Sequence, residues 1–129
     1  MEGIRNPREE TQMRIDVVGR NVEVTDEIRE DIQRGFHRVA RQVSDLAHLE
    51  VVLREETNPS ISDSQIAEAT LRLKGKTLRA REASPEMLHS IHHLAEDIRR
   101  QVKRHRDKRR KRGEARRGAR RLREGSVES

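Results

Sequence analysis

The most concentrated chemistry in this sequence is a run of positive charge near the C-terminus. Residues 99–123 hold 15 lysines and arginines against two acids, Asp107 and Glu114, so this stretch carries +13 in a chain whose net charge is +6. Each phosphate that a cation neutralises releases counterions, which makes such a run bind polyanions. Solubility alone needs fewer charges, so the run predicts a polyanion-binding segment rather than only a solvated helix end.

The kind of polyanion is narrowed by what the sequence lacks. Phe36 is the only aromatic residue, so unpaired bases have almost nothing on which to stack. A nucleic acid would therefore be bound through its backbone and shape. Anionic lipid fits less well, because the run offers only Leu122 for insertion into a bilayer. We predict a nucleic acid as the partner, with no membrane and no small-molecule substrate.

A second cluster, made of His89, His92, His93 and Glu96, has a spacing that resembles a metal site. At about 100° per residue these side chains fall opposite the apolar stripe of the same predicted helix, toward solvent. No second group of cysteine, histidine or carboxylate supplies the remaining ligands of a closed site. We interpret the cluster as exposed surface and expect neither a metal nor a cofactor.

Catalytic motifs are missing from the sequence. It contains no Gly-x-Ser-x-Gly turn, no phosphate-cradling glycine loop and no cysteine nucleophile, which predicts a protein that is not an enzyme. The lack of cysteine, of an apolar leader and of an apolar run long enough for a bilayer favours a cytoplasmic location.

Four strands are predicted from alternating apolar residues. The first covers residues 13–17, the second 49–53 and the third 67–73. A turn at Lys74-Gly75-Lys76 leads to a short fourth strand that begins at Leu78, so the last three strands form adjacent hairpins. Carboxylates on or between the second and third strands predict an acidic sheet side opposite a basic helix side: Glu50, Glu55, Glu56, Asp63 and Glu68.

Two amphipathic helices are predicted from apolar stripes of helical period. Thr25 is a suitable N-cap for the first. The second begins at Ser84-Pro85-Glu86, where a serine caps the helix and a proline takes its first position. Its stripe stops at Val102, so we expect the helix to project beyond the core and to fray toward Gly113. The stripes consist of Ile28, Ile32, Phe36, Val39 and Val43, and of Met87, Ile91, Leu94, Ala95, Ile98 and Val102.

The order β-α-β-β-β-α predicts an α+β fold, a four-stranded sheet with two helices on one face. A right-handed crossover would place the first strand parallel to a neighbour. Apolar residues are sparse near both ends of the chain. We therefore divide it into a disordered extension at 1–12, a folded domain at 13–108 and a flexible basic tail at 109–129.

Several blocks of residues resemble the bacterial ribosome hibernation promoting factors, together with the ribosome-associated inhibitor of the same fold. The most specific block lies in the second predicted helix, and the resemblance covers residues 13–108. The blocks are Gly19-x-Asn21-Val22-Glu23-Val24-Thr25 followed by Ile28-Arg29; Leu78-x-Ala80; Glu86-Met87 with Ile91 and Leu94; and Arg100-Gln101-Val102-x-Arg104-His105-Arg106-Asp107-Lys108.

The resemblance implies a domain similar to a double-stranded-RNA-binding domain, and a translation inhibitor that binds the ribosome in stationary phase or stress. Such a factor occupies the mRNA and the A- and P-site tRNA region of the small ribosomal subunit. The family's basic positions match Arg38, Arg100, Arg104, Arg106 and Lys108. Together with other cations of the two helices, the expected rRNA-binding residues are Arg34, Arg38, Arg41, Arg100, Lys103, Arg104, Arg106 and Lys108.

Three positions depart from the residues usual in the family. Leu88 replaces a tyrosine, His92 replaces an aspartate, and Asp97 replaces a lysine and so reverses a charge. Long members of the family carry a second, dimerising domain, and its lack here implies a short factor that is a monomer off the ribosome. Residues 1–12 precede the family's usual start, which makes Met13 an alternative initiator.

Two other functions stay open from the sequence. A general duplex RNA or DNA binder would use the same positive charge without preferring the ribosome. An interaction module would instead bind an acidic protein through the basic tail.

Overall fold

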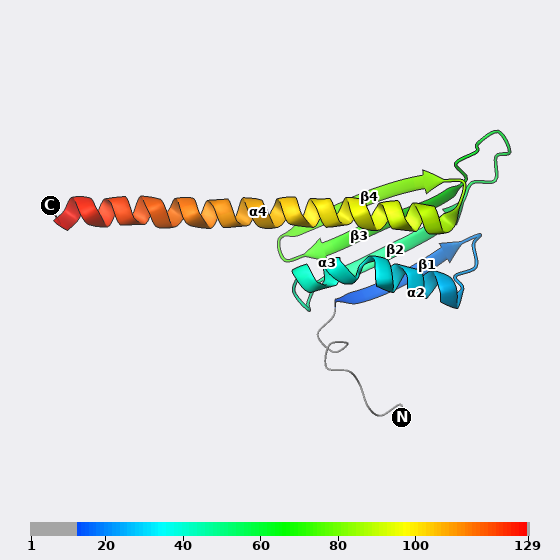
Figure 1. Cartoon of the computed structure of the whole chain (residues 1–129), viewed down its shortest axis with the longest axis horizontal. Helices are drawn as coiled ribbons and strands as arrows, with labels where there is room; N and C mark the ends of the chain where they lie inside the picture. Colours follow the sequence, from blue (N-terminus) through cyan, green and yellow to red (C-terminus); the bar gives the residue numbers. More distant parts are fainter. Residues whose placement is uncertain (1–12, 129) are drawn as a thin grey trace, which may run out of the picture.

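The chain folds into a four-stranded sheet that carries its described helices on one face (Figure 1). This computed structural model describes residues 13–128, and the side chains of residues 13–122. The predicted extension at 1–12 lies outside the described residues. In chain order the elements are β1 (Arg14–Arg20), α2 (Asp26–Gly35), α3 (His37–Gln42), β2 (His48–Glu55), β3 (Gln65–Leu73), β4 (Lys76–Ser84) and α4 (Met87–Glu128).

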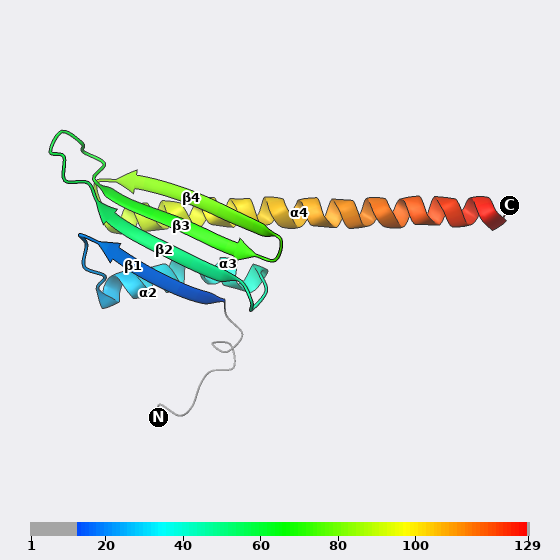
Figure 2. The same cartoon turned by 180° about the vertical axis from the view of Figure 1, so that it is seen from behind.

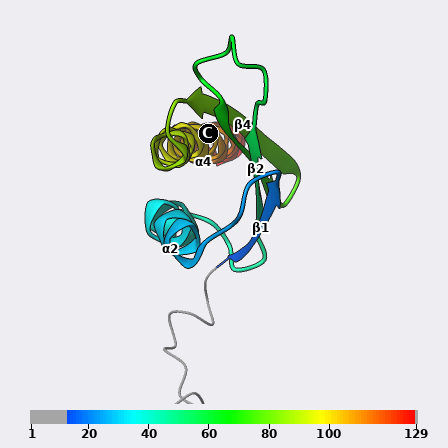
Figure 3. The ribbon, with the colours of Figure 1, turned by 90° about the vertical axis from the view of Figure 1, so that its right-hand side faces the viewer.

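The strands lie in the order β1-β2-β3-β4. β1 is parallel to β2, whereas β2 with β3 and β3 with β4 form antiparallel hairpins. A parallel pair needs a crossover connection, which α2 and α3 supply on the same face as α4 (Figure 3). The predicted α+β fold, with two hairpins and a parallel first strand, is confirmed. Its likeness to a double-stranded-RNA-binding domain stays a prediction.

The first helix differs from the single helix that the apolar stripe predicts. Thr25 caps it as expected, because its Oγ1 accepts the N–H of Ile28 at 3.2 Å. The chain then turns at Phe36, whose backbone angles of φ −96° and ψ 7° separate α2 from α3. Phe36 is completely buried and follows Gly35, a poor helix former. The interruption seats the aromatic ring in the core without changing which face is apolar.

The fourth strand is longer than predicted. β4 spans nine residues and pairs with β3 along its whole length, from Lys76 opposite Leu73 to Ser84 opposite Gln65. Only Leu78 is an apolar residue of substantial size in this strand, so the alternation is faint in the sequence. Gly75 makes the turn between the strands with φ +75°, a conformation that favours glycine.

α4 begins at Met87, two residues after the proline that was expected to open it. Ser84 still closes the turn, since its hydroxyl accepts the N–H of Glu86 at 3.3 Å. Its oxygen also lies 2.7 Å from the hydroxyl of Ser90, a fully buried group that donates to the carbonyl of Gln65 at 2.6 Å. This network ties the start of α4 to the end of the sheet.

The apolar stripe of α4 packs on the sheet as predicted. Five of its six members are buried, and Met87 packs against the same core. The largest completely buried side chains come from both layers: Ile32, Phe36 and Val39 from the first helices, Leu49, Val51, Leu53 and Leu71 from the strands, and Ile91, Leu94, Ile98 and Val102 from α4.

α4 continues far beyond its last buried residue, Val102. The helix does not end near Gly113, as the sequence suggested, but runs to Glu128. Residues 103–128, called the arm from here on, project from the domain over about 40 Å (Figures 1 and 2). Arginine, lysine, alanine and glutamate are good helix formers, and an interior glycine costs only about 1 kcal/mol. Whether residues 109–129 are flexible, as predicted, stays a prediction.

Candidate nucleic-acid interface

A groove runs between α2 and α3 on one side and α4 on the other. It has a volume of about 460 Å³, and its floor includes Ile91, Ala95 and Gly35. A Cβ on Gly35 would lie 3.5 Å from that of Ala95, so the two helices come close at this point. Two apolar stripes on one sheet thus leave a shallow channel whose rims are polar.

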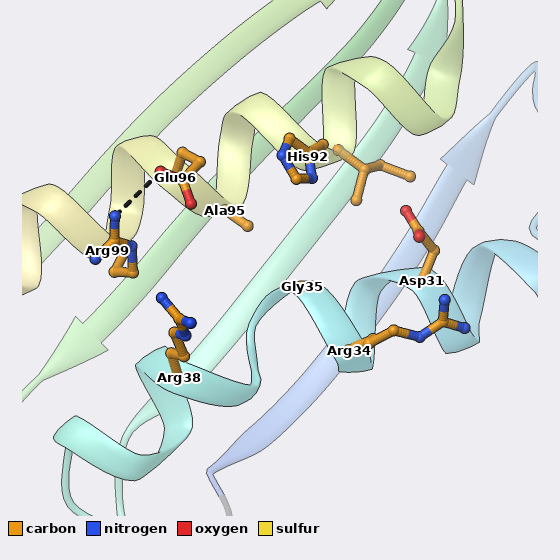
Figure 4. A pocket seen from close by; sticks show the side chains of 9 residues that line it. Asp31, Arg34, Gly35, Arg38, His92, Ala95, Glu96 and Arg99 are labelled. Carbon is orange, nitrogen blue, oxygen red and sulfur yellow. Dashed lines mark hydrogen bonds and ion pairs between the residues drawn. The ribbon is translucent and has the colours of Figure 1, made fainter.

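Arginines from α2, α3 and α4 line this groove (Figure 4). Arg34 of α2 and Arg38 of α3 lie on one rim, and Arg99 of α4 lies on the other. Asp31 and Glu96 also line the groove, so it is not uniformly positive. Figure 4 shows Arg38 extending from α3 toward the side of the groove that carries Arg99.

Arg99 is a groove residue that the sequence analysis did not select. Its Nη2 donates to Glu96 Oε2 at 3.1 Å, and this hydrogen bond and the nearby charge lower the pKa of Glu96. The Nε of Arg99 is buried and has no hydrogen-bond partner among the described residues. A buried N–H without an acceptor is costly, and Glu96 is the one partner that holds the Arg99 guanidinium among the described residues. Arg99 stands at the start of the basic run, but nothing in its spacing separates it from its neighbours.

The predicted rRNA-binding residues do not form a single patch. Arg34 and Arg38 share the groove, and Arg41 is exposed near the end of α3. Arg100 and Arg104 are exposed and lie on the outward face of α4, opposite its buried stripe. Lys103 and Lys108 are exposed on the flanks of that face, whereas Arg106 lies on the other side of the helix, beside a second cavity.

The histidine cluster is exposed, as interpreted from the sequence. The rings of His89 and His93 stack with centroids 4.9 Å apart on the outward side of α4. His92 turns toward the groove instead. No group of three or more metal-type ligands gathers anywhere in the part of the chain that the structure describes.

The open face of the sheet is not the acidic side that was expected. Glu50 and Glu68 do lie on it, but Glu68 pairs with Arg54 at 2.9 Å and Asp16 pairs with His48 at 2.6 Å. Outward strand positions hold more arginines than acids, namely Arg14, Arg20, Arg54, Arg72, Arg79 and Arg81. The prediction is wrong because it counted the carboxylates of β2 and β3 without the arginines that register places beside them.

The acids gather instead at the end of the domain that lies away from the arm. The loop between β2 and β3 contributes Glu56 and Asp63, and the first turn of α2 contributes Asp26 and Glu27. Both segments lie at the end of the sheet opposite the projecting helix (Figure 1). Charge is therefore separated along α4 rather than across the sheet. A molecule with this dipole turns its arm toward a polyanion as it approaches.

A membrane-crossing role has no support in the helices. Among residues 13–128, none of the helices combines the length and the apolar character that a bilayer span requires, since α4 is long but densely charged.

The sequence matches a known protein family over residues 15–110, described as "Sigma 54 modulation protein / S30EA ribosomal protein". Ribosome hibernation promoting factors from Salmonella typhimurium and Escherichia coli K12 are 31% and 29% identical to the chain over 96 residues. The aligned part covers 74% of this chain and 96% of either factor. A ribosome hibernation promotion factor from Picosynechococcus is 27% identical over 97 residues, which cover half of its length.

Solved structures share the fold. The crystal structure of the Thermus thermophilus Protein Y N-terminal domain superposes with a TM-score of 0.62 at 28% identity, covering 71% of this chain and 98% of that domain. A ribosomal subunit interface protein from Coxiella burnetii gives a TM-score of 0.63 over 74% of this chain and 99% of its own. Because the Coxiella burnetii protein is only 19% identical to this chain, its similarity supports the fold alone.

Proposed function

We propose that this chain, which belongs to the Sigma 54 modulation protein / S30EA ribosomal protein family, binds the ribosome and holds it in an inactive state. The observation that carries the proposal is the extent of the match to the hibernation promoting factors. Residues of this chain align with nearly the whole length of the Escherichia coli factor. What the two proteins share is therefore an entire factor and not one motif of it.

The site proposed on the ribosome is the small subunit, where mRNA and the A- and P-site tRNAs would lie. Inhibition would follow from occupancy, and no reaction is needed. The cations of the helix layer would face rRNA phosphates, with Arg34, Arg38 and Arg99 in the groove and Arg100 and Arg104 on the outward face of α4. Binding in stationary phase or stress, in the cytoplasm, belongs to the same proposal.

Sedimentation on sucrose gradients tests ribosome binding directly. The chain should travel with the small subunit or the intact ribosome at low salt, and the bound fraction should fall steeply as salt rises, because phosphate contacts release counterions. A chain that stays at the top of the gradient at low salt would contradict the proposal. Addition of the protein to a cell-free translation reaction should lower its rate.

A pair of charge reversals tests where the contact lies. Arg100→Glu with Arg104→Glu should weaken ribosome binding and leave the unfolding free energy almost unchanged, since both side chains are exposed. The matched control is Arg20→Glu with Arg79→Glu, which changes the net charge equally on the open face of the sheet. Equal losses for the two variants would mean that net charge, and not the helix layer, directs binding.

The charge of the arm also favours a second candidate, a general duplex-binding protein. Equal affinity for ribosomes and for a random RNA duplex in direct competition would support that function over ribosome binding. An acidic protein partner predicts instead that complexes survive nuclease treatment.

A further inference from the structure

A second cavity lies where α4 leaves the domain. It has a volume of about 450 Å³ and is bounded by the end of α3 and the loop after it, the β3–β4 turn, and α4. Its apolar wall includes Val43, Leu73 and Leu46, and the side chain of Leu46 is 93% exposed. These elements meet at the end of the sheet from which the arm projects (Figure 2).

Four of the seven polar residues that line this cavity are cationic, and the other three are Gln42, Ser44 and His105. Lys74 contributes from the β3–β4 turn, and Arg106 and Arg109 contribute from α4. Arg72 only borders the cavity, because register assigns its side chain to the open face of the sheet. No aspartate or glutamate is among the residues that line it. Cations of the turn and of α4 thus meet with no carboxylate among the lining residues, which concentrates positive potential at this place.

His105 also lines this cavity, and its pKa is lowered there. Burial lowers the pKa of its imidazole, and the positive charges of Arg109 and Lys76 lower it further, followed by those of Arg112 and Lys108. Lys76 belongs to β4, so the cations that act on His105 come from the sheet as well as from its own helix. Lys74 and Arg106 line the same cavity.

The arm continues this positive face. Successive residues of a helix are turned by 100°, so Arg109, Arg112 and Arg116 fall within about 60° of each other on the side of Val102 and His105. The opposite side also carries cations, among them Arg104 and Lys111, but it holds the two acids Asp107 and Glu114 as well. Net positive charge is therefore denser on the side of the arm that is turned toward the end of the sheet.

We infer that the corner between the end of the sheet and the arm is a second binding surface, which takes the phosphate backbone of a nucleic-acid duplex. This corner surface consists of Lys74, Arg106, Arg109, Arg112 and Arg116. It lies on the side of α4 opposite Arg100 and Arg104, which belong to the surface assigned to the ribosome above. The inference stands on the arm and the second cavity and does not need that assignment.

Three features favour a duplex over other polyanions. The arginines of the arm recur at intervals along a straight helix, as phosphates recur along a duplex strand. Phe36, the sole Phe, Tyr or Trp residue of the chain, is completely buried. The exposed rings of His89, His92 and His93 lie near the start of α4, far along the helix from the corner, so the corner offers the bases of a single strand little to stack on. A protein groove would need apolar anchors at helical spacing on the arm, and the positive face of the arm has none between residues 103 and 122.

Two surfaces on opposite sides of one helix give the protein a property that neither has alone. A duplex in the corner would leave Arg100 and Arg104 free to contact other phosphates. The chain would then join two nucleic-acid segments across the thickness of α4.

The test compares two variants of the full chain that lose the same charge. Arg109→Gln with Arg116→Gln removes two positive charges from the corner surface, whereas Lys111→Gln with Ala115→Glu lowers the net charge by two on the opposite side of the arm. Affinity for a blunt RNA duplex and for a DNA duplex of the same sequence is measured over a range of salt. The corner variant should make the plot of log affinity against log salt shallower by about two, and the control variant should leave it nearly unchanged.

A second readout locates the bound duplex. The pKa of His105, followed by NMR of its ring, should rise when either duplex is added, because phosphates offset the surrounding cations. Equal changes of salt slope in the two variants, together with an unmoved His105, would overturn the inference. A rise in the pKa of His105 with a polyglutamate peptide but with neither duplex would also overturn it, in favour of an acidic protein as the occupant.

Discussion

The two halves of α4 form one continuous helix for different physical reasons. Met87 to Val102 places an apolar stripe against the sheet, and five of its residues are buried. The arm makes no such contact beyond the second cavity, so its helix depends on the propensity of its residues and on local pairs such as Arg110 with Asp107 at 3.6 Å. Contacts with the sheet stabilise the helix in the first half, whereas interactions within the helix stabilise it in the second half.

Stability and polyanion binding therefore depend mainly on different parts of α4. Substitutions in the buried stripe of the packed half should act first on folding, since they alter the core. Substitutions in the arm should act first on polyanion binding, since they alter charge. A deletion and substitutions in both halves test this separation.

Deletion of residues 109–129 should have the largest effect on binding. This segment contains nine lysines and arginines and three glutamates, so it carries the whole net charge of +6. The charges of residues 1–108 sum to zero. Affinity for a duplex at low salt should fall on the order of a hundredfold, with a shallower salt dependence. The free energy of unfolding measured in urea should not change.

The control for the deletion is a chain whose last 21 residues are replaced by glycine and serine. It should behave like the deletion in both measurements. A large loss of stability in either chain would show that the arm supports the domain, against the separation proposed here.

Ile91→Ala should cause the largest loss of stability among single changes. Ile91 is completely buried between the helices and the sheet, so truncation removes apolar contacts and leaves a cavity, at a cost of about 2 to 5 kcal/mol. Arg109→Ala, on the same side of α4 but in the arm, should change the unfolding free energy by less than about 0.5 kcal/mol. Urea unfolding of both variants measures the contrast, and similar losses would contradict it.

Gly113→Ala with Gly118→Ala should strengthen the arm alone. Alanine stabilises a helix interior by about 1 kcal/mol per glycine replaced. A Cβ at Gly118 would meet nothing within 4 Å, and one at Gly113 would meet only the flexible end of Arg117 at 3.4 Å. Circular dichroism should show a helix signal that persists to higher temperature before the domain melts. The melting temperature of the domain should stay the same, and a shift in it would mean that the halves are coupled.

Asp16→Asn should have the smallest effect and only in acid. The hydrogen bond from His48, followed in importance by the charge of Arg14, keeps the pKa of Asp16 below its ordinary value of 3.8. A carboxylate with a lowered pKa adds stability above the pKa of the unfolded chain and loses it as pH falls through the folded value. The variant should therefore lose less stability than the parent when pH drops below about 4. Asp45→Asn, in the exposed loop before β2, is the control. If both variants lose the same stability in acid, the Asp16–His48 pair is not the source of the effect.

Much of the packed domain was predictable because its signals are local and periodic. The apolar stripes located the helices, alternation located β1 to β3, and Thr25 capped α2 as expected. The break at Phe36 and the length of β4 were missed, because burial of one ring and pairing with β3 outweigh weak sequence patterns. The family resemblance, which depended on blocks of residues, was confirmed by the match over residues 15–110.

The candidate site was predictable only in part. The cations of the helices were found from their type, but their division between the groove, the outward face of α4 and the corner surface was not. Arg99 was missed, since only the approach of α2 and α3 to α4 makes it a groove residue. The supposed acidic sheet side failed for the same reason, because strand register places arginines from four strands among the acids.

Residue types and their spacing alone set the composition of the surfaces and the identity of the core. Positive charge gathers in the last third of the chain, and apolar residues recur at helical and strand periods, whatever the fold. Which charges share a surface depends on how the elements pack. Lys74 joins Arg106 and Arg109 because the β3–β4 turn ends where α4 leaves the sheet. Such contacts between residues distant in sequence depend on packing geometry, which no local pattern encodes.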